Sequence, residues 1–359
     1  MTKRHATIRD VARVSGVSVA TVSRVLNGLD VVAEATRDKI LQAVEQLDYV
    51  PHSAARAMAT RQTTTIGVLL PDLHGEFFSE VIRGVDIAAR AAHYHLLLSH
   101  SHGDPEEAMA AIRAMRSRVD GMIVMAPTIE PGGLMTLVRQ SKLPVVLLNT
   151  DFPSSGVPSS TSVMVDNVAG ARMLTEHLIA QGYNRIAHIS GPPGNRESQG
   201  RQSGYEAAIN AAFGVGSTMI VAGDFSEAAG FAAGRAIVAG ALRPDAVFAA
   251  NDIMAIGCID ALHQAGFAVP ADIAVVGFDD IPAARFITPA LTTVRVHIAE
   301  LGRIAAKRLI AQVLGDGNAA DGDAMPQPEI VVRVSCGALS TRQGATYQQK
   351  NPVEGRVEL

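Results

Sequence analysis

Residues 7–27 read T-I-R-D-V-A-R-V-S-G-V-S-V-A-T-V-S-R-V-L-N, and their apolar spacing predicts two short helices joined by a tight turn. Thr7 can cap the first helix, whose apolar side chains recur at helical spacing from Ile8. Gly16 supplies the permissive backbone of the turn, and Ser18 can cap the second helix. The second helix then turns an apolar stripe inward, formed by Val22, Val25 and Leu26.

The outward face of the second helix is small apart from one arginine. It carries Val19, Ala20, Ser23, Arg24 and Asn27. Small side chains let a helix approach base edges closely in a DNA major groove, and an arginine can bond a base there. We therefore expect this end of the chain to bind DNA. The alternative is a helix pair without a ligand, because short helix pairs with a glycine turn are common.

A third helix and a hinge are predicted after this pair. Apolar residues at helical spacing over residues 34–47 complete a three-helix unit that ends near Tyr49. The next stretch, S-A-A-R-A-M-A at residues 53–59, favours a helix but is too short to be stable alone, so we expect a hinge. Met58 lies between Arg56 and Arg61, which is typical of minor-groove binding. The alternative is a linker whose Met58 docks on the next domain.

Charge separates this end from the rest of the chain. Residues 1–62 hold nine of the 31 Lys and Arg residues but only six of the 35 Asp and Glu residues. A mildly basic head on an acidic body localises phosphate binding to the head.

Composition indicates a well-packed chain of two or three domains, with 48% apolar and 18% charged residues in 359. No run of eighteen apolar residues and no apolar signal core occur, so we expect a cytoplasmic protein.

Cys258 and Cys336 are isolated, which predicts buried reduced thiols. Four histidines suggest a metal site at first sight, but carboxylates or cysteines at ligand spacing are missing, so we expect no metal and no cofactor. These are His93, His95, His100 and His102.

Short apolar runs alternate with amphipathic helices from residue 64 onward, which predicts parallel sheets covered on both faces. Strands are expected at residues 66–70, 95–99, 121–125, 145–148, 185–189, 219–221, 246–249 and 273–277. Helices are expected at residues 78–92, 105–117, 168–181, 202–212, 227–239, 253–265 and 298–314. A stretch rich in proline, serine and glycine at residues 151–158 divides this body, so we expect two open α/β lobes of doubly wound parallel sheets.

The predicted organisation follows from these patterns. A DNA-binding headpiece spans residues 1–50, a hinge spans 51–63 and the two-lobed core spans 64–336. We place the first lobe at residues 64–160 and 292–320 and the second at 161–291 and 321–336. A polar tail, residues 337–359, follows without leucine heptads, which argues against a coiled-coil tetramer.

The loops at the carboxyl ends of the predicted strands carry the candidate ligand residues, because ligands of open α/β sheets bind there. These are Asp72, Phe77, Phe78, Asn149, Arg196, Arg201, Phe225, Asn251 and Asp279. Aromatic rings, amides, carboxylates and a forked arginine suit a polar, hydroxyl-rich small molecule. Phe77 and Phe78 could instead be core residues, and Arg201 could brace a helix start. Asp279 is the strongest candidate, since it follows an apolar strand directly.

The motifs together resemble the lactose/galactose-repressor family of bacterial transcription factors, from about Ala6 to Val334. Besides residues 7–27, the matching pieces are Y-V-P at Tyr49, A-A-R-A-M at Ala54, T-I-G-V-L-L-P-D at Thr65, N-D-I-M-A-I-G at Asn251, V-V-G-F-D-D at Val275 and T-P-A-L-T-T-V at Thr288. The resemblance implies a helix-turn-helix headpiece, a periplasmic-binding-protein-like core, and a homodimer on a near-palindromic operator.

The resemblance also implies roles for single residues on the DNA side. Base reading falls to Val19, Ala20 and Arg24, and contact with the DNA backbone to Thr7, Ser18, Thr21, Ser23 and Asn27. The minor-groove hinge comprises Ala55, Arg56 and Met58. Met58 stands where the family usually has leucine, and we expect it to insert with less preorganisation, since methionine is flexible.

On the effector side, Phe77, Asn149, Arg201, Phe225, Asn251 and Asp279 fall on ligand-contacting positions of family members. The implied function is repression of carbohydrate uptake or catabolism genes under allosteric control by a small sugar. A purine is the alternative, which Phe77 with Phe78 would suit. However, Asn195 stands where a purine-binding relative would place arginine. The sequence leaves open whether the effector releases or recruits DNA binding.

Two other classes of protein compete with this interpretation. A solute-binding protein shares the two-lobed body, but residues 1–62 argue against it. An α/β enzyme is disfavoured because no nucleophile elbow, phosphate loop or dinucleotide fingerprint follows a strand. We therefore expect no catalytic residues and no enzymatic activity.

Overall fold

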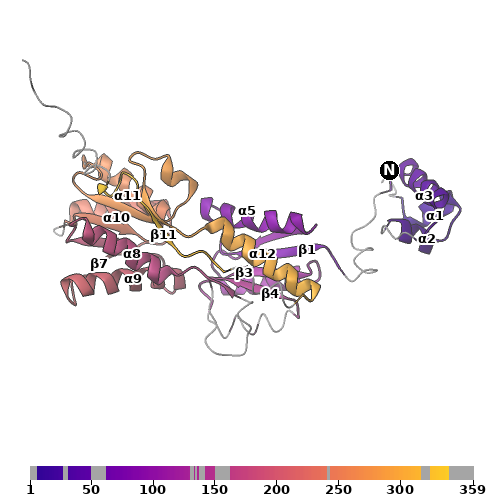
Figure 1. The fold of residues 1–359 in the computed structure, drawn as a ribbon, viewed down its shortest axis with the longest axis horizontal. Helices are drawn as coiled ribbons and strands as arrows, with labels where there is room; N and C mark the ends of the chain where they lie inside the picture. The colour runs from indigo at the N-terminus through magenta and orange to yellow at the C-terminus, as the bar shows by residue number, and fades with distance from the viewer. Residues whose placement is uncertain are drawn as a thin grey trace, which may run out of the picture. The chain divides into compact units, whose positions relative to one another are not determined.

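The structure is a computed structural model, and it describes residues 6–26, 31–49, 62–129, 133, 136, 142–149, 162–240, 243–316 and 324–338. The chain forms two compact units, Met1–Thr64 and Thr65–Leu359. Figure 1 shows helices alone in the first unit and two α/β lobes in the second. The predicted hinge residues Ala55, Arg56 and Met58 lie outside the described residues, as do Asn27 and residues 339–359.

The first unit contains α1 (Ile8–Ser15), α2 (Val19–Leu26) and α3 (Glu34–Gln46), which confirms the helix pair and the third helix. Thr7 caps α1 in a capping box with Asp10, and Gly16 ends the helix with a φ of 69°. The Ser18 hydroxyl accepts the Thr21 amide proton, 3.1 Å away, at the start of α2. The three helices pack around a small core of Val11, Ala12, Val22, Val25, Ile40, Ala43 and Tyr49.

The first lobe is built on a parallel sheet of order β2-β1-β3-β4-β5. Its strands are β1 (Thr65–Leu70), β2 (His95–His100), β3 (Gly121–Met125), β4 (Val145–Leu148) and β5 (Ser162–Val163). Alternate side chains of β1 point to opposite faces, so Val68 joins one core and Leu69 the other. One face carries α5 (Glu76–Ala91) and the other α6 (Pro105–Met115).

A third helix of the first lobe, α12 (Ile298–Leu314), arrives from much later in the chain and lies beside α5. Glycines allow this close crossing. A Cβ on Gly84 would lie 1.8 Å from the Ala299 carbonyl oxygen, and one on Gly302 would lie 2.2 Å from the Val81 carbonyl oxygen. The two helices therefore pack backbone to backbone, with α12 over β3 and β4 and α5 against β2.

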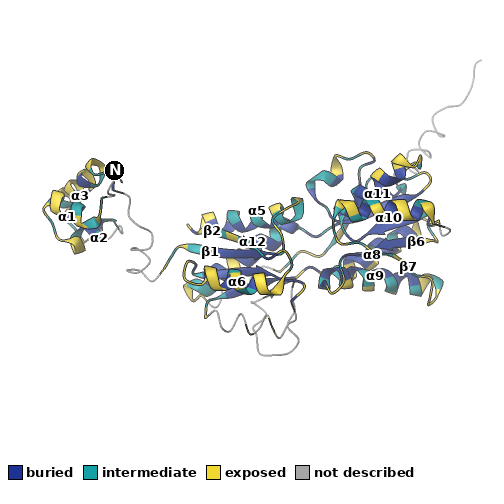
Figure 2. Cartoon of the chain, turned by 180° about the vertical axis from the view of Figure 1, so that it is seen from behind, coloured by how far each residue is buried: buried dark blue, intermediate teal, exposed yellow. Residues whose placement is uncertain are grey.

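The second lobe is built on a sheet of order β11-β10-β9-β8-β6-β7. Its strands are β6 (Ile186–Ile189), β7 (Met219–Val221), β8 (Ala246–Ala249), β9 (Ala274–Asp279), β10 (Thr292–Arg295) and β11 (Glu329–Val331), of which β11 is antiparallel. The faces are covered by α8 (Asn167–Ala180) with α9 (Arg196–Phe213), and by α10 (Glu227–Ala239) with α11 (Asp252–Gln264). A short 3₁₀ helix, η2 (Pro282–Arg285), follows β9. In Figure 2 the buried strands lie between helices whose outer faces are exposed.

Most predicted elements of the core are confirmed within two residues at either end. The prediction was wrong at α9, which begins at Arg196 and not at residue 202, because Asn195 caps it ahead of any apolar repeat. Strands β5, β10 and β11 were not predicted. β5 and β11 are very short, and β10 begins with two threonines in place of an apolar run.

The predicted lobe boundaries need two corrections. Strand β5 pairs with β4, so residues 162–163 belong to the first lobe and not to the second. Strand β10 pairs with β9, so residues 292–295 belong to the second lobe and not to the first. Both differences follow from β5 and β10, whose sequences do not show the apolar pattern of a strand. The chain passes from one lobe to the other in the segments that join β5 to α8, β10 to α12, and α12 to β11.

Two further observations concern the whole described chain. Cys258 and Cys336 are buried and free, as predicted. Among the described helices, none combines the length and apolar character needed to cross a membrane.

Candidate functional site

The outward face of α2 in the first unit is open to solvent. Val19, with 42% of its surface exposed, and exposed Ala20 and Arg24 lie on this face, while Val22 and Val25 are buried beneath it. Of the predicted inward set, Leu26 is partly buried against the same core, and of the predicted outward set Ser23 is half-buried. A small apolar surface with one arginine at its end is available to a partner.

Three of the residues predicted to contact the DNA backbone also hold the helix starts. The Thr7 hydroxyl donates to the Asp10 carboxylate at 2.7 Å, and the Ser18 and Thr21 hydroxyl oxygens lie 2.8 Å apart in a hydrogen bond. Half-buried Ser23 lies one turn further along α2. Capping keeps the first turns of both helices ordered near the exposed face.

Arg201 and Asp279 form the centre of the polar site in the second lobe. α9 presents Arg201 and the end of β9 presents Asp279, and the two residues are 3% and 5% exposed. Arg201 Nη2 lies 2.9 Å from Asp279 Oδ1. Its Nε donates to Asn167 Oδ1 at 2.9 Å, and its Nη1 donates to the Ala250 carbonyl oxygen at 2.5 Å. A guanidinium has five donor hydrogens, so these contacts leave some for another acceptor.

Burial dominates the electrostatics of this pair. It raises the pKa of the Asp279 carboxyl to about 7, although the Arg201 charge acts to lower that pKa, and the Glu197 carboxylate raises it further. Desolvation penalises the charged form of a carboxyl that has left water. The site therefore holds a carboxyl group whose charge changes near neutral pH.

Two aromatic rings lie against the Arg201 guanidinium. Its carbon is 4.1 Å from the ring centre of Phe278 and 5.7 Å from that of Phe225. Phe225 has a φ of 72°, and its ring fills the space above Gly191, where a Cβ would lie 2.4 Å from a ring carbon. Phe225 is half-buried, so part of the ring is accessible for stacking.

Asn251 has a structural role that the sequence did not predict. Its side-chain oxygen accepts the Met254 amide proton at 2.9 Å and so caps α11. Its amide nitrogen donates to the Phe225 carbonyl oxygen at 3.0 Å. Asn251 thus holds the backbone of the residue that carries the accessible ring.

A hydrogen bond joins the two lobes at the other end of the site. Asn149, which follows β4 and is 4% exposed, donates from its side-chain nitrogen to the Glu197 carboxylate of α9. The Asn149 oxygen accepts the Val165 amide proton at 3.0 Å, which fixes the orientation of the side chain. Burial raises the pKa of Glu197.

A hollow of about 290 Å³ opens beside this hydrogen bond. It is lined by Asn149, Met164, Asn167, Gly194, Arg196, Glu197 and Gln199. Amides, a carboxyl and a guanidinium face the same space, and together they can donate to and accept from several hydroxyl groups. The predicted effector residue Arg196 is part of this lining, and so is its neighbour Glu197.

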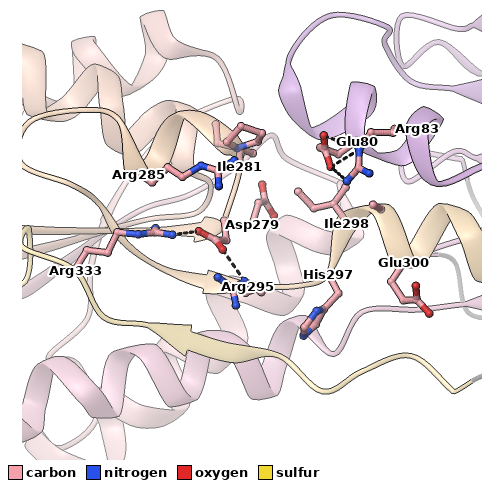
Figure 3. A pocket seen from close by; sticks show the side chains of 13 residues that line it. Glu80, Arg83, Asp279, Ile281, Arg285, Arg295, His297, Ile298, Glu300 and Arg333 are labelled. Carbon is pink, nitrogen blue, oxygen red and sulfur yellow. Dashed lines mark hydrogen bonds and ion pairs between the residues drawn. The ribbon is translucent and has the colours of Figure 1, made fainter.

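A second hollow, of about 430 Å³, lies on the Asp279 side between the lobes (Figure 3). Of the predicted effector residues, only Asp279 belongs to its described lining. Arg295 and Arg333 share the Asp280 carboxylate at 2.7 Å and 2.5 Å, and Arg83 binds Glu80 at 2.5 Å. Most of its charged groups are thus paired within the protein.

The aromatic pair of the first lobe lies apart from these two linings. Phe77 and Phe78 are half-buried against the core, with ring centres 5.4 Å apart in a T-shaped arrangement. Exposed Asp72 accepts the amide protons of Leu73 and His74 at 2.6 Å and 3.0 Å and so shapes its own loop. The structure gives these residues structural contacts and does not bring them to either hollow.

Asp252 is a second buried carboxyl, next to the predicted effector residue Asn251. It is fully buried, and burial raises its pKa well above the usual range for aspartate. Asp252 lies in the first turn of α11, where acidic residues are common, so its position in the sequence indicates no special role.

The described residues contain no group of three His, Cys, Asp or Glu side chains that could hold a metal ion. His102 instead bonds the Glu107 carboxylate at 2.8 Å and stacks edge-on against His100.

Comparison with known proteins identifies both units. Residues 7–52 match the model of bacterial regulatory proteins of the lacI family, and residues 175–336 match a periplasmic binding protein-like domain. The ribose operon repressor of Escherichia coli K12 is 37% identical over 86% of this chain and 93% of its own length. The chain belongs to the lacI family of bacterial regulatory proteins.

Other relatives of this lacI-family regulator agree. The transcriptional repressor PurR of Photobacterium profundum is 36% identical over 92% of the chain and 98% of its own length. The crystal structure of a Lac repressor dimer bound to operator and an anti-inducer superposes with a TM-score of 0.81 at 27% identity, covering 93% of this chain and 99% of the other. The lacI-family regulator is thus a DNA-binding transcriptional repressor and not an enzyme.

Proposed function

We propose that this repressor binds a near-palindromic operator as a homodimer in the cytoplasm. The observation that carries the proposal is the exposed face of α2, where Val19, Ala20 and Arg24 are accessible above a capped and packed helix pair. These three residues read base edges in the major groove. Thr7, Ser18, Thr21, Ser23 and Asn27 contact the DNA backbone, and Ala55, Arg56 and Met58 open the minor groove.

The experiment compares Arg24→Ala with Arg13→Ala, since both remove one exposed headpiece arginine. An operator obtained by selection from random DNA is competed against unrelated DNA in a gel shift. A bidentate arginine–guanine contact discriminates by about 1–3 kcal/mol, so Arg24→Ala should lose roughly tenfold or more of the operator preference. Arg13→Ala should weaken binding to both DNAs equally. Unchanged operator preference in Arg24→Ala would refute the base-reading role.

We further propose that the effector is a small carbohydrate bound between the lobes, and that the repressor controls genes for uptake or catabolism of that carbohydrate. The polar lining around Asn149, Arg196 and Glu197, with Arg201 and Asp279 nearby, supports a hydroxyl-rich ligand. Phe225 offers a ring for stacking. The name of the ribose operon repressor makes ribose the first compound to test.

The remaining predicted contacts belong to the same proposal. Asp72, Phe77 and Phe78 are outside the described linings of both hollows and are proposed as contacts from the first lobe, and Asn251 acts by holding Phe225. A purine that stacks on Phe77 and Phe78 is the alternative effector. Thermal shift of the full chain with ribose, galactose and hypoxanthine separates the two classes, because a ligand of the native state raises the melting temperature. Stabilisation by hypoxanthine alone would refute the proposal that the effector is a carbohydrate.

A further inference from the structure

The turn after β9 carries unusual backbone strain beside the Arg201–Asp279 pair. Asp279 and Asp280 have φ values of 116° and 58°, in the left-handed region that side chains other than glycine rarely adopt. Such strain costs free energy and persists only where the surroundings over-determine the conformation. Arg295 and Arg333 hold the Asp280 carboxylate, and the turn ends at the next residue, Ile281.

Asp252 provides the contact at the far end of this turn. Its Oδ2 accepts the Ile281 amide proton at 2.9 Å, and its Oδ1 accepts the Thr293 hydroxyl of β10 at 2.5 Å. Both acceptors are fully buried. β9 makes room for the carboxyl at Gly277, where a Cβ would lie 2.2 Å from Asp252 Oδ1.

Helix capping does not explain this carboxyl. Asn251 already caps α11 by accepting the Met254 amide proton, so the Asp252 side chain is directed away from its own helix to the strained turn. We propose that Asp252 is a positioning residue for effector binding: it clamps Ile281 to β10 and so fixes the turn that aims the Asp279 carboxylate at Arg201. The consequence for effector affinity rests on the proposed function, whereas the geometry of the turn does not.

Two substitutions of Asp252 should affect the clamp differently. In Asp252→Asn the amide oxygen can still accept the Ile281 proton, and the amide nitrogen can donate to the Thr293 hydroxyl oxygen. Asp252→Ala leaves both partners buried without an acceptor. Asn should therefore preserve the turn, and Ala should release it.

Ser335 offers a matched control on the same two strands. Its hydroxyl oxygen accepts the Thr292 amide proton at 2.9 Å and donates to the Val275 carbonyl oxygen at 2.6 Å, and the side chain is fully buried. Ser335 thus joins β9 and β10 at the end far from Asp279. Ser335→Ala loses two buried hydrogen bonds, as Asp252→Ala does, without touching the turn.

The first measurement is hydrogen exchange at Arg201 Nε–H, which donates to Asn167, by NMR of the full chain with labelled arginine. The signal is assigned by its loss in Arg201→Lys. We expect exchange at least tenfold faster in Asp252→Ala, and within threefold of the parent in Asp252→Asn and Ser335→Ala. Thr293→Val, which removes one half of the clamp, replaces Asp252→Ala if that variant does not fold.

The second measurement is the affinity for ribose by titration calorimetry. We expect Asp252→Ala to bind at least tenfold more weakly, with Asp252→Asn and Ser335→Ala close to the parent. Equal exchange and equal affinity in Asp252→Ala and the parent would overturn the proposal. An effect of Ser335→Ala as large as that of Asp252→Ala would overturn it as well, because the role would then be purely structural. If the parent binds no ribose, the carbohydrate assignment fails for ribose, and the exchange measurement alone decides the positioning role.

Discussion

Arg201→Met tests the buried ion pair most directly, because it keeps the bulk of the side chain and removes its charge. The substitution leaves the Asp279 carboxylate buried without its cation and the Ala250 carbonyl without its donor. Removing one partner of a buried pair typically costs about 3–5 kcal/mol. We expect the free energy of unfolding of the second lobe to fall by this amount at pH 8.

The pH dependence of this loss follows from the pKa of Asp279, which burial raises to about 7. At pH 5 Asp279 is largely protonated with or without Arg201, so the charge–charge part of the loss should disappear. What remains is the unsatisfied Ala250 carbonyl and Asn167 oxygen, at about 1–3 kcal/mol for each buried group. The cost of Arg201→Met should therefore be smaller at pH 5 than at pH 8.

The assay is urea unfolding of the full chain, followed by hydrogen exchange of second-lobe peptides, since a chain of several domains need not unfold in one step. Asp279→Asn and the double variant complete a mutant cycle. We expect a coupling of about 2–3 kcal/mol at pH 8, because Asp279→Asn removes the charge that Arg201→Met strands. Additive losses at pH 8, or an equal cost of Arg201→Met at both pH values, would refute the buried ion pair.

Three other predictions concern separate parts of the molecule. Thr7→Ala should destabilise the headpiece by about 1 kcal/mol and speed amide exchange in α1, because it removes the capping box. Thr7→Ser keeps the capping hydroxyl and should stay close to the parent. Gly84→Ala should lower the urea midpoint of the first lobe by an amount equivalent to about 1–3 kcal/mol, since α5 and α12 must separate; an unchanged midpoint contradicts the close crossing. The second lobe should lose stability as the pH rises from about 4 to about 7. Over this range the Asp279 carboxyl keeps its proton in the folded chain but loses it in the unfolded chain, because burial raises its pKa only in the folded chain. One such group changes stability by at most about 1.4 kcal/mol per pH unit, and the slope from this group should vanish in Asp279→Asn.

The sequence predicted the architecture well because apolar periodicity reports buried faces directly. Val22 and Val25 of α2, and the strand Ala274–Asp279, are buried as their spacing requires. Prediction failed where polar residues build the fold. Asn195 starts α9 with a side-chain cap in a polar stretch, and the strand β10 begins with Thr292 and Thr293.

The candidate site was predicted only in part for a related reason. A polar residue at the carboxyl end of a strand can face a ligand or cap the next helix, and the sequence does not distinguish the two. Asn251 caps α11, and Asp72 shapes its own loop, whereas Asn149 and Asp279 do line the hollows. Glu197 and Asp252 stand beside predicted site residues, but their partners were not predicted, because only the folded chain brings them to Asn149 and to the turn after β9.

The late position of α12 has a consequence for synthesis on the ribosome. The sheet of the first lobe is complete once Val163 has emerged, yet the helix that covers β3 and β4 begins only at Ile298. At about 5–20 residues per second, the apolar face over these strands waits on the order of ten seconds for its cover. During that time the nascent first lobe exposes Ile123, Val146 and Leu148, so a chaperone that shields this face should raise the yield of folded protein. A chain truncated before α12 should aggregate, although every strand of its first sheet is present.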